Sequence, residues 1–131
     1  RLSREADPVS VRVQEADFDV SAEIAALTGA DHEIGAIATF IGKVRGTAHG
    51  QALQSMMLEH YPGMTEDELA RIEAEAHSRF KLSASLIVHR VGTLRPGDNI
   101  VLVITCSAHR GEAFQACEFL MDYLKTLAPF W

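Results

Sequence analysis

The segment ASLIVHRVGTLRPGDNIVLVITCS, residues 84–107, contains two runs rich in valine and isoleucine on either side of the sequence TLRPGD. Pro96 followed by Gly97 favours a type II turn, because proline suits the second position of that turn and glycine the third. β-Branched residues are enriched in strands. We therefore expect ASLIVHRVG and NIVLVITCS to form a strand pair.

Two further strands are expected earlier in the chain. The run GAIATFIGKVRG, residues 35–46, has the period of two that is typical of a strand. This period places the side chains of Lys43 and Arg45 on the same face of the strand, close to its end. Both are expected to point together toward whatever lies beyond that end. The run LQSMMLEHY, residues 53–61, is the next strand candidate, and the Pro-Gly pair that follows ends it.

Three segments show the spacing of apolar residues that is typical of amphipathic helices. The first covers residues 20–30 and closes on a glycine cap. The second starts at Thr65, and we expect the charged residues along it, including Glu73, to face solvent. The third covers residues 111–128, where Phe114 is expected to begin the apolar stripe.

The predicted order of elements is helix, two strands, helix, two strands, helix. Because the strands come in pairs and do not alternate strictly with helices, the order favours an α+β fold with a mostly antiparallel sheet packed by helices. No repeat or linker-like stretch divides the chain. Its 131 residues bury enough apolar surface to form a single domain, residues 1–131.

The composition argues against several classes of protein. The formal net charge of −6 argues against a nucleic-acid partner, because phosphate binding needs a broad basic patch. No apolar run approaches the roughly 20 residues that cross a bilayer. Two cysteines are too few for a secreted disulfide framework, so we expect a soluble protein of the reducing cytoplasm. The first residues, RLSREADP, lack a signal-peptide core and a methionine, and we expect a trimmed start.

The strongest local signal for chemistry is SAHRGEAF, where a strand ends and the last helix begins. Ser107, His109 and Arg110 fall together at this point. Free backbone N–H groups, the helix dipole, an arginine and an imidazole together suit a phosphate or a carboxylate. The same residues also fit a purely structural role, in which Ser107 caps the helix and both basic side chains face solvent.

Three further cations are candidates for binding or catalysis. Lys43 and Arg45 could reach one ligand together, although cations at a strand end often protect an exposed edge. Lys125 lies at the border between the buried and exposed faces of the last helix. Its amine would act in catalysis if burial or nearby arginines lowered its pKa; otherwise it complements the helix end as an ordinary cation.

Metal and cysteine chemistry are not indicated. The six histidines show no metal-binding pair on one helix and no CxxC partner, so we predict no metal site. Cys106 and Cys117 fall at apolar periodic positions, where cysteine behaves as a small hydrophobic residue. No dinucleotide fingerprint, P-loop or nucleophile elbow occurs, and we predict no cofactor.

Five segments stand in one order along the chain: GAIATFIGKVRG, LEHYPGMTE, HRVGTLRPGD, SAHRGEAFQACEFLMDYLKT and APFW. Over about residues 34–131 they resemble the large, catalytic subunit of molybdopterin synthase. The resemblance implies an α+β fold with a hammerhead-like sheet element. It also implies a sulfurtransferase of molybdenum cofactor biosynthesis, which inserts two sulfurs into cyclic pyranopterin monophosphate and so forms the dithiolene of molybdopterin.

The resemblance further implies partners. A small ubiquitin-like subunit would carry the sulfur as a thiocarboxylate after its C-terminal Gly-Gly and thread that tail into a pocket of the large subunit. Two large subunits would form a homodimer within a heterotetramer that contains two small subunits.

The resemblance also implies which residues form the site. Lys125, in the LKT segment, matches the family's catalytic lysine, and His109 is a candidate proton shuttle. The family usually has a second functional lysine directly after the APFW segment, and this sequence ends at Trp131, before that position. The alternative from another class of function is a noncatalytic receptor for a ubiquitin-like tail, or an anion-binding scaffold. The substrate-binding residues of the family match Lys43, Val44, Arg45, His109, Arg110 and Lys125.

Overall fold

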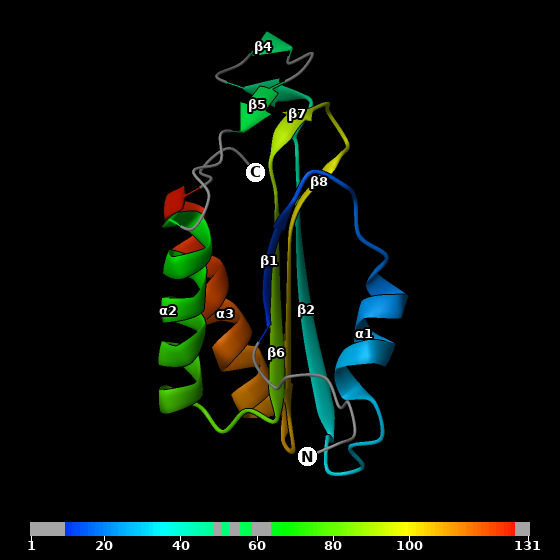
Figure 1. Cartoon of the computed structure of the whole chain (residues 1–131), viewed down its shortest axis with the longest axis vertical. Coiled ribbons are helices and arrows are strands. Elements are labelled where there is room, and N and C mark those ends of the chain that lie inside the picture. Colours follow the sequence, from blue (N-terminus) through cyan, green and yellow to red (C-terminus); the bar gives the residue numbers. More distant parts are fainter. Residues whose placement is uncertain (1–9, 49–50, 53–55, 59–63, 128–131) are drawn as a thin grey trace.

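The computed structural model of the chain describes residues 10–48, 51–52, 56–58 and 64–127, and shows three layers built around a four-stranded sheet (Figure 1). The elements in chain order are β1 (Val11–Gln14), α1 (Val20–Thr28), β2 (Ala36–Lys43), β3 (Thr47–Ala48), β4 (Gln51–Ala52), β5 (Met56–Leu58), α2 (Met64–Arg79), β6 (Ala84–Arg90), β7 (Gly92–Leu94), β8 (Asn99–Ser107) and α3 (Arg110–Leu127).

The main sheet has the strand order β1-β6-β8-β2. β8 is antiparallel to both β6 and β2, whereas β1 runs parallel to β6. The expected strand pair of β6 and β8 and the expected α+β class are therefore confirmed. Two short pairs, β3-β4 and β5-β7, lie together at one end of the molecule (Figure 1). Of the expected strand 53–61, only residues 56–58 are described, as β5.

The two faces of the sheet are covered by different helices (Figure 1). α2 and α3 cover one face, where Leu69 and Leu124 are fully buried. α1 covers part of the other face, where Ile24 packs in the cluster that contains the buried Leu102. Because β8 lies in the middle of the sheet and between the helix layers, Ile100 to Ser107 are all buried. This burial on both faces explains why residues 100–104 of the strand form a continuous apolar run.

Two expectations about the helices are wrong. Phe114 is 64% exposed, and the buried stripe of α3 starts instead at Ala113. Glu73 on α2 is only 2% exposed. It is buried because this side of α2 packs against β1 and β6, and β1 was not expected from the sequence. The expected glycine cap is confirmed, since Gly29 follows α1 with a φ of 49° and its N–H donates to the carbonyl of Ala25.

In the part of the chain that the structure describes, none of the helices combines the length and the apolar content that a bilayer span requires.

Candidate functional site

The cations predicted to share one site lie at two ends of the sheet. β2 pairs with β8 so that Ala36 is opposite Ser107 and Lys43 is opposite Asn99. At about 3.3 Å per residue, these two ends of β2 lie about 23 Å apart. The structure therefore separates the strand-end pair Lys43 and Arg45 from the helix-start pair that follows Ser107.

α3 carries a predicted site residue near each of its own ends. It starts at Arg110, directly after β8, and runs back along the sheet (Figure 1). At 1.5 Å per residue, Lys125 lies about 22 Å along the helix from Arg110. Lys125 is therefore placed toward the same end of the molecule as Lys43, and His109 stays with Arg110 at the opposite end.

At the first end, the backbone around Val44 is held firmly. Its N–H donates to the carbonyl of Asp98, and its own carbonyl accepts from the N–H of Gly97, both at 2.9 Å. The Val44 side chain is 3% exposed. Because the backbone groups and the side chain are already engaged, Val44 acts here as an anchor that presents its two exposed neighbours, Lys43 and Arg45.

Lys43 takes part in a short polar chain at this end. Its Nζ donates to Oδ1 of Asn99 at 2.9 Å, and Nδ2 of Asn99 donates to Oδ1 of Asp17 at 3.0 Å. The hydrogen bond from Asn99 lowers the pKa of Asp17, with smaller contributions from the charges of Arg90 and Lys43. The carboxylate of Asp17 therefore stays ionised. Through Asn99, it holds the side chain of Lys43 in place.

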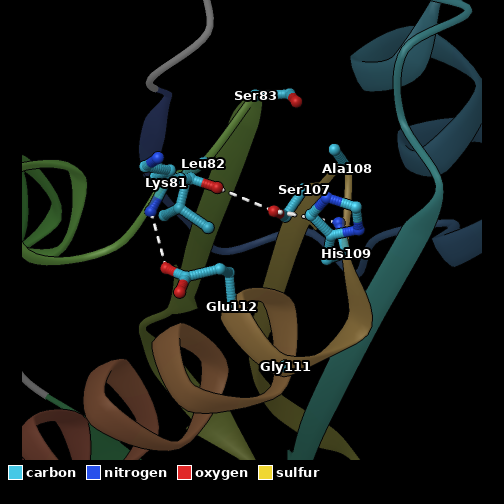
Figure 2. Close-up of a pocket in the computed structure, with 8 residues that line it drawn as sticks. All are labelled: Lys81, Leu82, Ser83, Ser107, Ala108, His109, Gly111 and Glu112. Atoms are coloured by element: carbon cyan, nitrogen blue, oxygen red, sulfur yellow. Dashed lines mark hydrogen bonds between the residues drawn. The ribbon is translucent and has the colours of Figure 1, made fainter.

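At the opposite end, a pocket of about 580 Å³ opens beside the start of α3 (Figure 2). The Ser107 hydroxyl donates to the carbonyl of Lys81 at 2.7 Å and accepts from the N–H of His109 at 3.4 Å. Glu112 Oε1 accepts from the N–H of Lys81 at 2.8 Å. The lining residues are Lys81, Leu82, Ser83, Ser107, Ala108, His109, Gly111 and Glu112.

The two interpretations of the helix start are each met in part. Ser107 is 1% exposed and is held structurally, but it does not cap α3, because its hydroxyl accepts from the N–H of His109, which precedes the helix, and donates to the carbonyl of Lys81. His109 lines the pocket and is exposed, so its imidazole is available to a ligand. Arg110 is exposed but is not among the lining residues. The sequence did not indicate Lys81 and Glu112, because the contact that joins them links residues 31 positions apart.

The two cysteines are poor nucleophiles in this fold. Cys106 and Cys117 are 0% and 8% exposed. Burial raises the pKa of each thiol to about 11, so both remain protonated at neutral pH. Among the described residues, no group of histidine, cysteine, aspartate or glutamate side chains could hold a metal ion.

The same α+β fold is found in two solved structures of known proteins. The molybdopterin biosynthesis MoaE protein from Burkholderia ambifaria MC40-6 superposes with a TM-score of 0.82 at 51% identity, over 89% of this chain and 76% of that one. Molybdopterin synthase from Staphylococcus aureus gives a TM-score of 0.77 at 28% identity, over 86% and 81%. Both comparisons place the chain among proteins of molybdopterin biosynthesis by fold.

The family follows from the sequence comparisons. Residues 13–127 match the model of the MoaE protein family. The chain is also 60% identical to the molybdopterin synthase catalytic subunit of Ralstonia nicotianae. The matched 122 residues cover 93% of this chain and 69% of that relative. The chain belongs to the MoaE family. The family and the enzyme class that the sequence predicted are thereby confirmed.

Proposed function

We propose that this chain is the catalytic subunit of a molybdopterin synthase. It transfers sulfur from a thiocarboxylated small subunit to cyclic pyranopterin monophosphate and so forms the dithiolene of molybdopterin. The observation that carries the proposal is the 60% identity to a molybdopterin synthase catalytic subunit over 93% of the chain. A protein named as a catalytic subunit works with a further subunit, which is here the ubiquitin-like sulfur carrier.

The cations at the two ends of the sheet suit an anionic substrate and an anionic transition state. The ammonium of Lys125 would stabilise the negative charge that develops as C–S bonds form and C–O bonds break. The exposed imidazole of His109 would carry protons. Arg45 and Arg110 would bind the substrate phosphate, because a guanidinium matches two phosphate oxygens with parallel hydrogen bonds.

A single copy of the chain does not bring all of these groups to one small substrate. One end of the sheet holds Lys43, Arg45 and Lys125. The opposite end holds His109 and Arg110. A separation of about 23 Å along a strand exceeds the reach of one pterin phosphate. The complete site therefore needs a second copy, as in the homodimer within a heterotetramer.

β2 offers a route to such a dimer. It is an edge strand of the main sheet, so the backbone along one of its sides is not paired within the sheet. Two of its apolar residues, Ile37 and Ile41, are 43% and 38% exposed. If two β2 strands paired antiparallel about a two-fold axis, the Lys43 end of one copy would meet the Ala36 end of the other. Ser107 lies opposite Ala36. The helix start of one copy would then be about two strand spacings, or about 10 Å, from Lys43 of its partner.

A test of the activity uses Lys125→Ala. This change leaves the fold intact, because the side chain lies at the border of the core, and it removes most of the sulfur transfer. The assay combines the variant with thiocarboxylated small subunit and pterin precursor, and measures dithiolene product. Full product formation would reject the role of Lys125. Capture of the small subunit without product in the wild-type protein would reject the enzyme.

A test of the shared site mixes two variants, Lys125→Ala and Arg110→Ala, at a pterin concentration at which each variant alone forms little product. If each site takes Lys125 from one copy and Arg110 from the other, a mixed dimer contains one intact site. Equal mixing after subunit exchange should restore about a quarter of the wild-type activity, since half of the dimers are mixed. If mixed dimers form and no activity returns, each site belongs to one copy.

The phosphate-binding role is tested by titration. Arg45→Ala and Arg110→Ala should each weaken the binding of the pterin phosphate, and the wild-type affinity should fall as salt concentration rises, because exposed charges are screened. An unchanged affinity in both variants would contradict this part of the proposal.

A further inference from the structure

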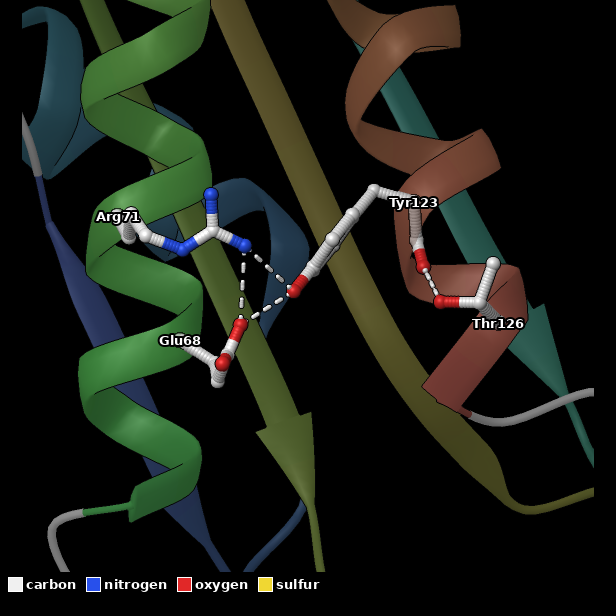
Figure 3. Close-up of polar contacts among 4 residues, drawn as sticks. All are labelled: Glu68, Arg71, Tyr123 and Thr126. Atoms are coloured by element: carbon white, nitrogen blue, oxygen red, sulfur yellow. Dashed lines mark hydrogen bonds and ion pairs between the residues drawn. The ribbon is translucent and has the colours of Figure 1, made fainter.

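A polar cluster joins α2 to the last turn of α3 (Figure 3). The hydroxyl of Tyr123 on α3 donates to Oε1 of Glu68 on α2. Nη2 of Arg71 donates to the same Oε1 and to the Tyr123 hydroxyl oxygen, both at 3.1 Å. The Arg71 guanidinium also lies 5.7 Å from the centre of the Tyr123 ring. Glu68, Arg71 and Tyr123 are called the Tyr123 cluster below.

The cluster lies next to Lys125 along the chain but on another side of the helix. At 3.6 residues per turn, a side chain two positions after Tyr123 points about 200° away from it. Leu124, between the two, is fully buried against the core. The cluster and Leu124 therefore fix the rotation of this turn about the helix axis, and this rotation sets the direction in which Lys125 leaves the helix.

The end of the helix receives one more hydrogen bond. Thr126 Oγ1 donates to the carbonyl of Tyr123 at 2.6 Å. The last four carbonyls of a helix have no partner within the backbone of that helix, and helix ends open more easily than helix centres. A catalytic lysine in the final turn needs this turn to be closed, and the Tyr123 cluster ties it to the middle of α2.

The charges within the cluster favour the arrangement. The hydrogen bonds from Tyr123 and Arg71 lower the pKa of Glu68, so the acceptor is a carboxylate. The same bond to Glu68 raises the pKa of the Tyr123 phenol, which therefore keeps its proton and remains a donor. Hydrogen bonds to a charged acceptor are the stronger and better-directed kind. Because Glu68 and Arg71 are exposed, the cluster contributes orientation more than global stability.

We propose that Glu68, Arg71 and Tyr123 are positioning residues for Lys125, which hold the last turn of α3 in the orientation that sulfur transfer requires. The inference rests on the proposed role of Lys125 in catalysis.

The decisive variant is Tyr123→Phe, which removes the hydroxyl and keeps the packing of the ring. Small displacements of a catalytic group have large effects on rate, so we expect kcat for sulfur transfer to fall about tenfold. We expect KM for the pterin to stay unchanged and the melting temperature to stay within about 2 °C, because exposed pairs add little stability. Glu68→Ala should behave like Tyr123→Phe, whereas Glu68→Gln, which keeps an acceptor oxygen, should retain most of the rate.

The same two helices supply a matched control away from Lys125. Arg79 on α2 donates through Nε to Oε2 of Glu75 at 2.7 Å, and its guanidinium lies 4.7 Å from the centre of the Phe119 ring on α3. This is also an exposed contact between α2 and α3, made of an arginine, a carboxylate and an aromatic ring. Arg79→Met should therefore leave kcat unchanged.

Hydrogen exchange gives a readout that does not depend on activity. In Tyr123→Phe, the backbone amides of residues 124–127 should exchange faster than in the wild type, while exchange in the middle of α3 stays the same. Arg79→Met should leave the exchange of residues 124–127 unchanged. A loss of kcat without faster exchange in this turn would contradict the positioning role.

Lys125→Ala, measured in the same assay, distinguishes a failure of the positioning role from a failure of the proposed role of Lys125. If Lys125→Ala is inactive and Tyr123→Phe matches the wild type in kcat, the positioning role is wrong and the proposed function stands. If Lys125→Ala is fully active, the role of Lys125 fails and the positioning role fails with it. If Arg79→Met loses as much rate as Tyr123→Phe, the effect is general helix packing, and the inference is overturned.

Discussion

The buried carboxylate of Glu73 predicts that its own contribution to the stability of this protein falls as pH rises from about 4.5 to about 7. Its Oε2 accepts from the Ser85 hydroxyl at 2.5 Å and from the N–H of Ser10 at 2.9 Å. Nε2 of His77 lies 2.8 Å from the same Ser85 hydroxyl oxygen. The Ser85 hydroxyl has a single hydrogen, and it donates this hydrogen to Glu73. The N–H at Nε2 of His77 is therefore the donor of the hydrogen bond to the Ser85 oxygen. Burial also lowers the pKa of His77, which keeps this ring neutral at pH 7.

The size of the effect follows from the pKa of Glu73. Burial raises this pKa from 4.5 to about 7, and the hydrogen bonds from Ser85 and Ser10 only partly oppose the rise. The folded protein therefore binds the Glu73 proton more tightly than the unfolded chain does. Each pKa unit corresponds to about 1.4 kcal/mol, so the group adds about 3 kcal/mol to the free energy of unfolding below pH 4.5, and this contribution is lost above pH 7.

The perturbation is Glu73→Gln, which keeps the size and an acceptor oxygen of the side chain but cannot ionise. We expect the variant to gain stability relative to the wild type as pH rises. The difference in the free energy of unfolding should grow by about 2 to 3 kcal/mol between pH 5 and pH 8. Urea denaturation at several pH values in this range measures it.

A control accounts for the loss of one negative charge. Glu118→Gln removes an exposed carboxylate from α3. If Glu73→Gln differs from the wild type by the same amount at every pH, or follows Glu118→Gln, the carboxylate of Glu73 does not titrate in this window, and the reasoning from its burial is refuted.

Three further predictions concern packing and reactivity. A Cβ on Gly35 would lie 2.3 Å from the carbonyl oxygen of Ala108, so Gly35→Ala should lower the free energy of unfolding by about 1 to 3 kcal/mol in urea denaturation. Leu124→Ala removes a fully buried side chain and should cost about 2 to 5 kcal/mol in the same measurement. Cys106 and Cys117 have thiol pKa values of about 11, so iodoacetamide at pH 7.5 should alkylate them only after unfolding, as mass spectrometry would show.

The central strand pair was predictable because its environment is uniform. β8 is buried on both faces, and its residues 100–104 form the continuous apolar run that is typical of such a strand. β1 was not predictable in the same way. It is four residues long, its valines are only half-buried, and it pairs in parallel with β6, which lies more than 70 residues further along the chain. No turn sequence signals such a pairing, and the burial of Glu73 was missed for the same reason.

The apolar face of α3 shows how packing decides between two equivalent patterns. Phe114 and Ala113 stand three and four residues before Cys117, and both spacings fit one side of a helix. The larger side chain is the natural expectation for the core. In the structure, the Thr105 hydroxyl on β8 donates to the carbonyl of Ala113 at 2.7 Å. This close approach leaves room for a methyl group, so Ala113 faces the sheet and Phe114 faces outward.

The sequence yields a hypothesis about which residues form the candidate site, but it does not indicate how they are arranged. A strand period predicts that Lys43 and Arg45 share a face, but β2 ends at Lys43 after a register shift, and Arg45 lies beyond the strand. A strand-to-helix junction predicts that His109 and Arg110 stand together. Neither pattern contains the direction of β2 relative to β8. The antiparallel register places the two pairs at opposite ends of the sheet, and α3 brings Lys125 back toward the end that holds Lys43. If both pairs bind one substrate, two copies must meet. The prediction of a homodimer and the prediction of the site residues are therefore one prediction, and the mixing of Lys125→Ala with Arg110→Ala tests both at once.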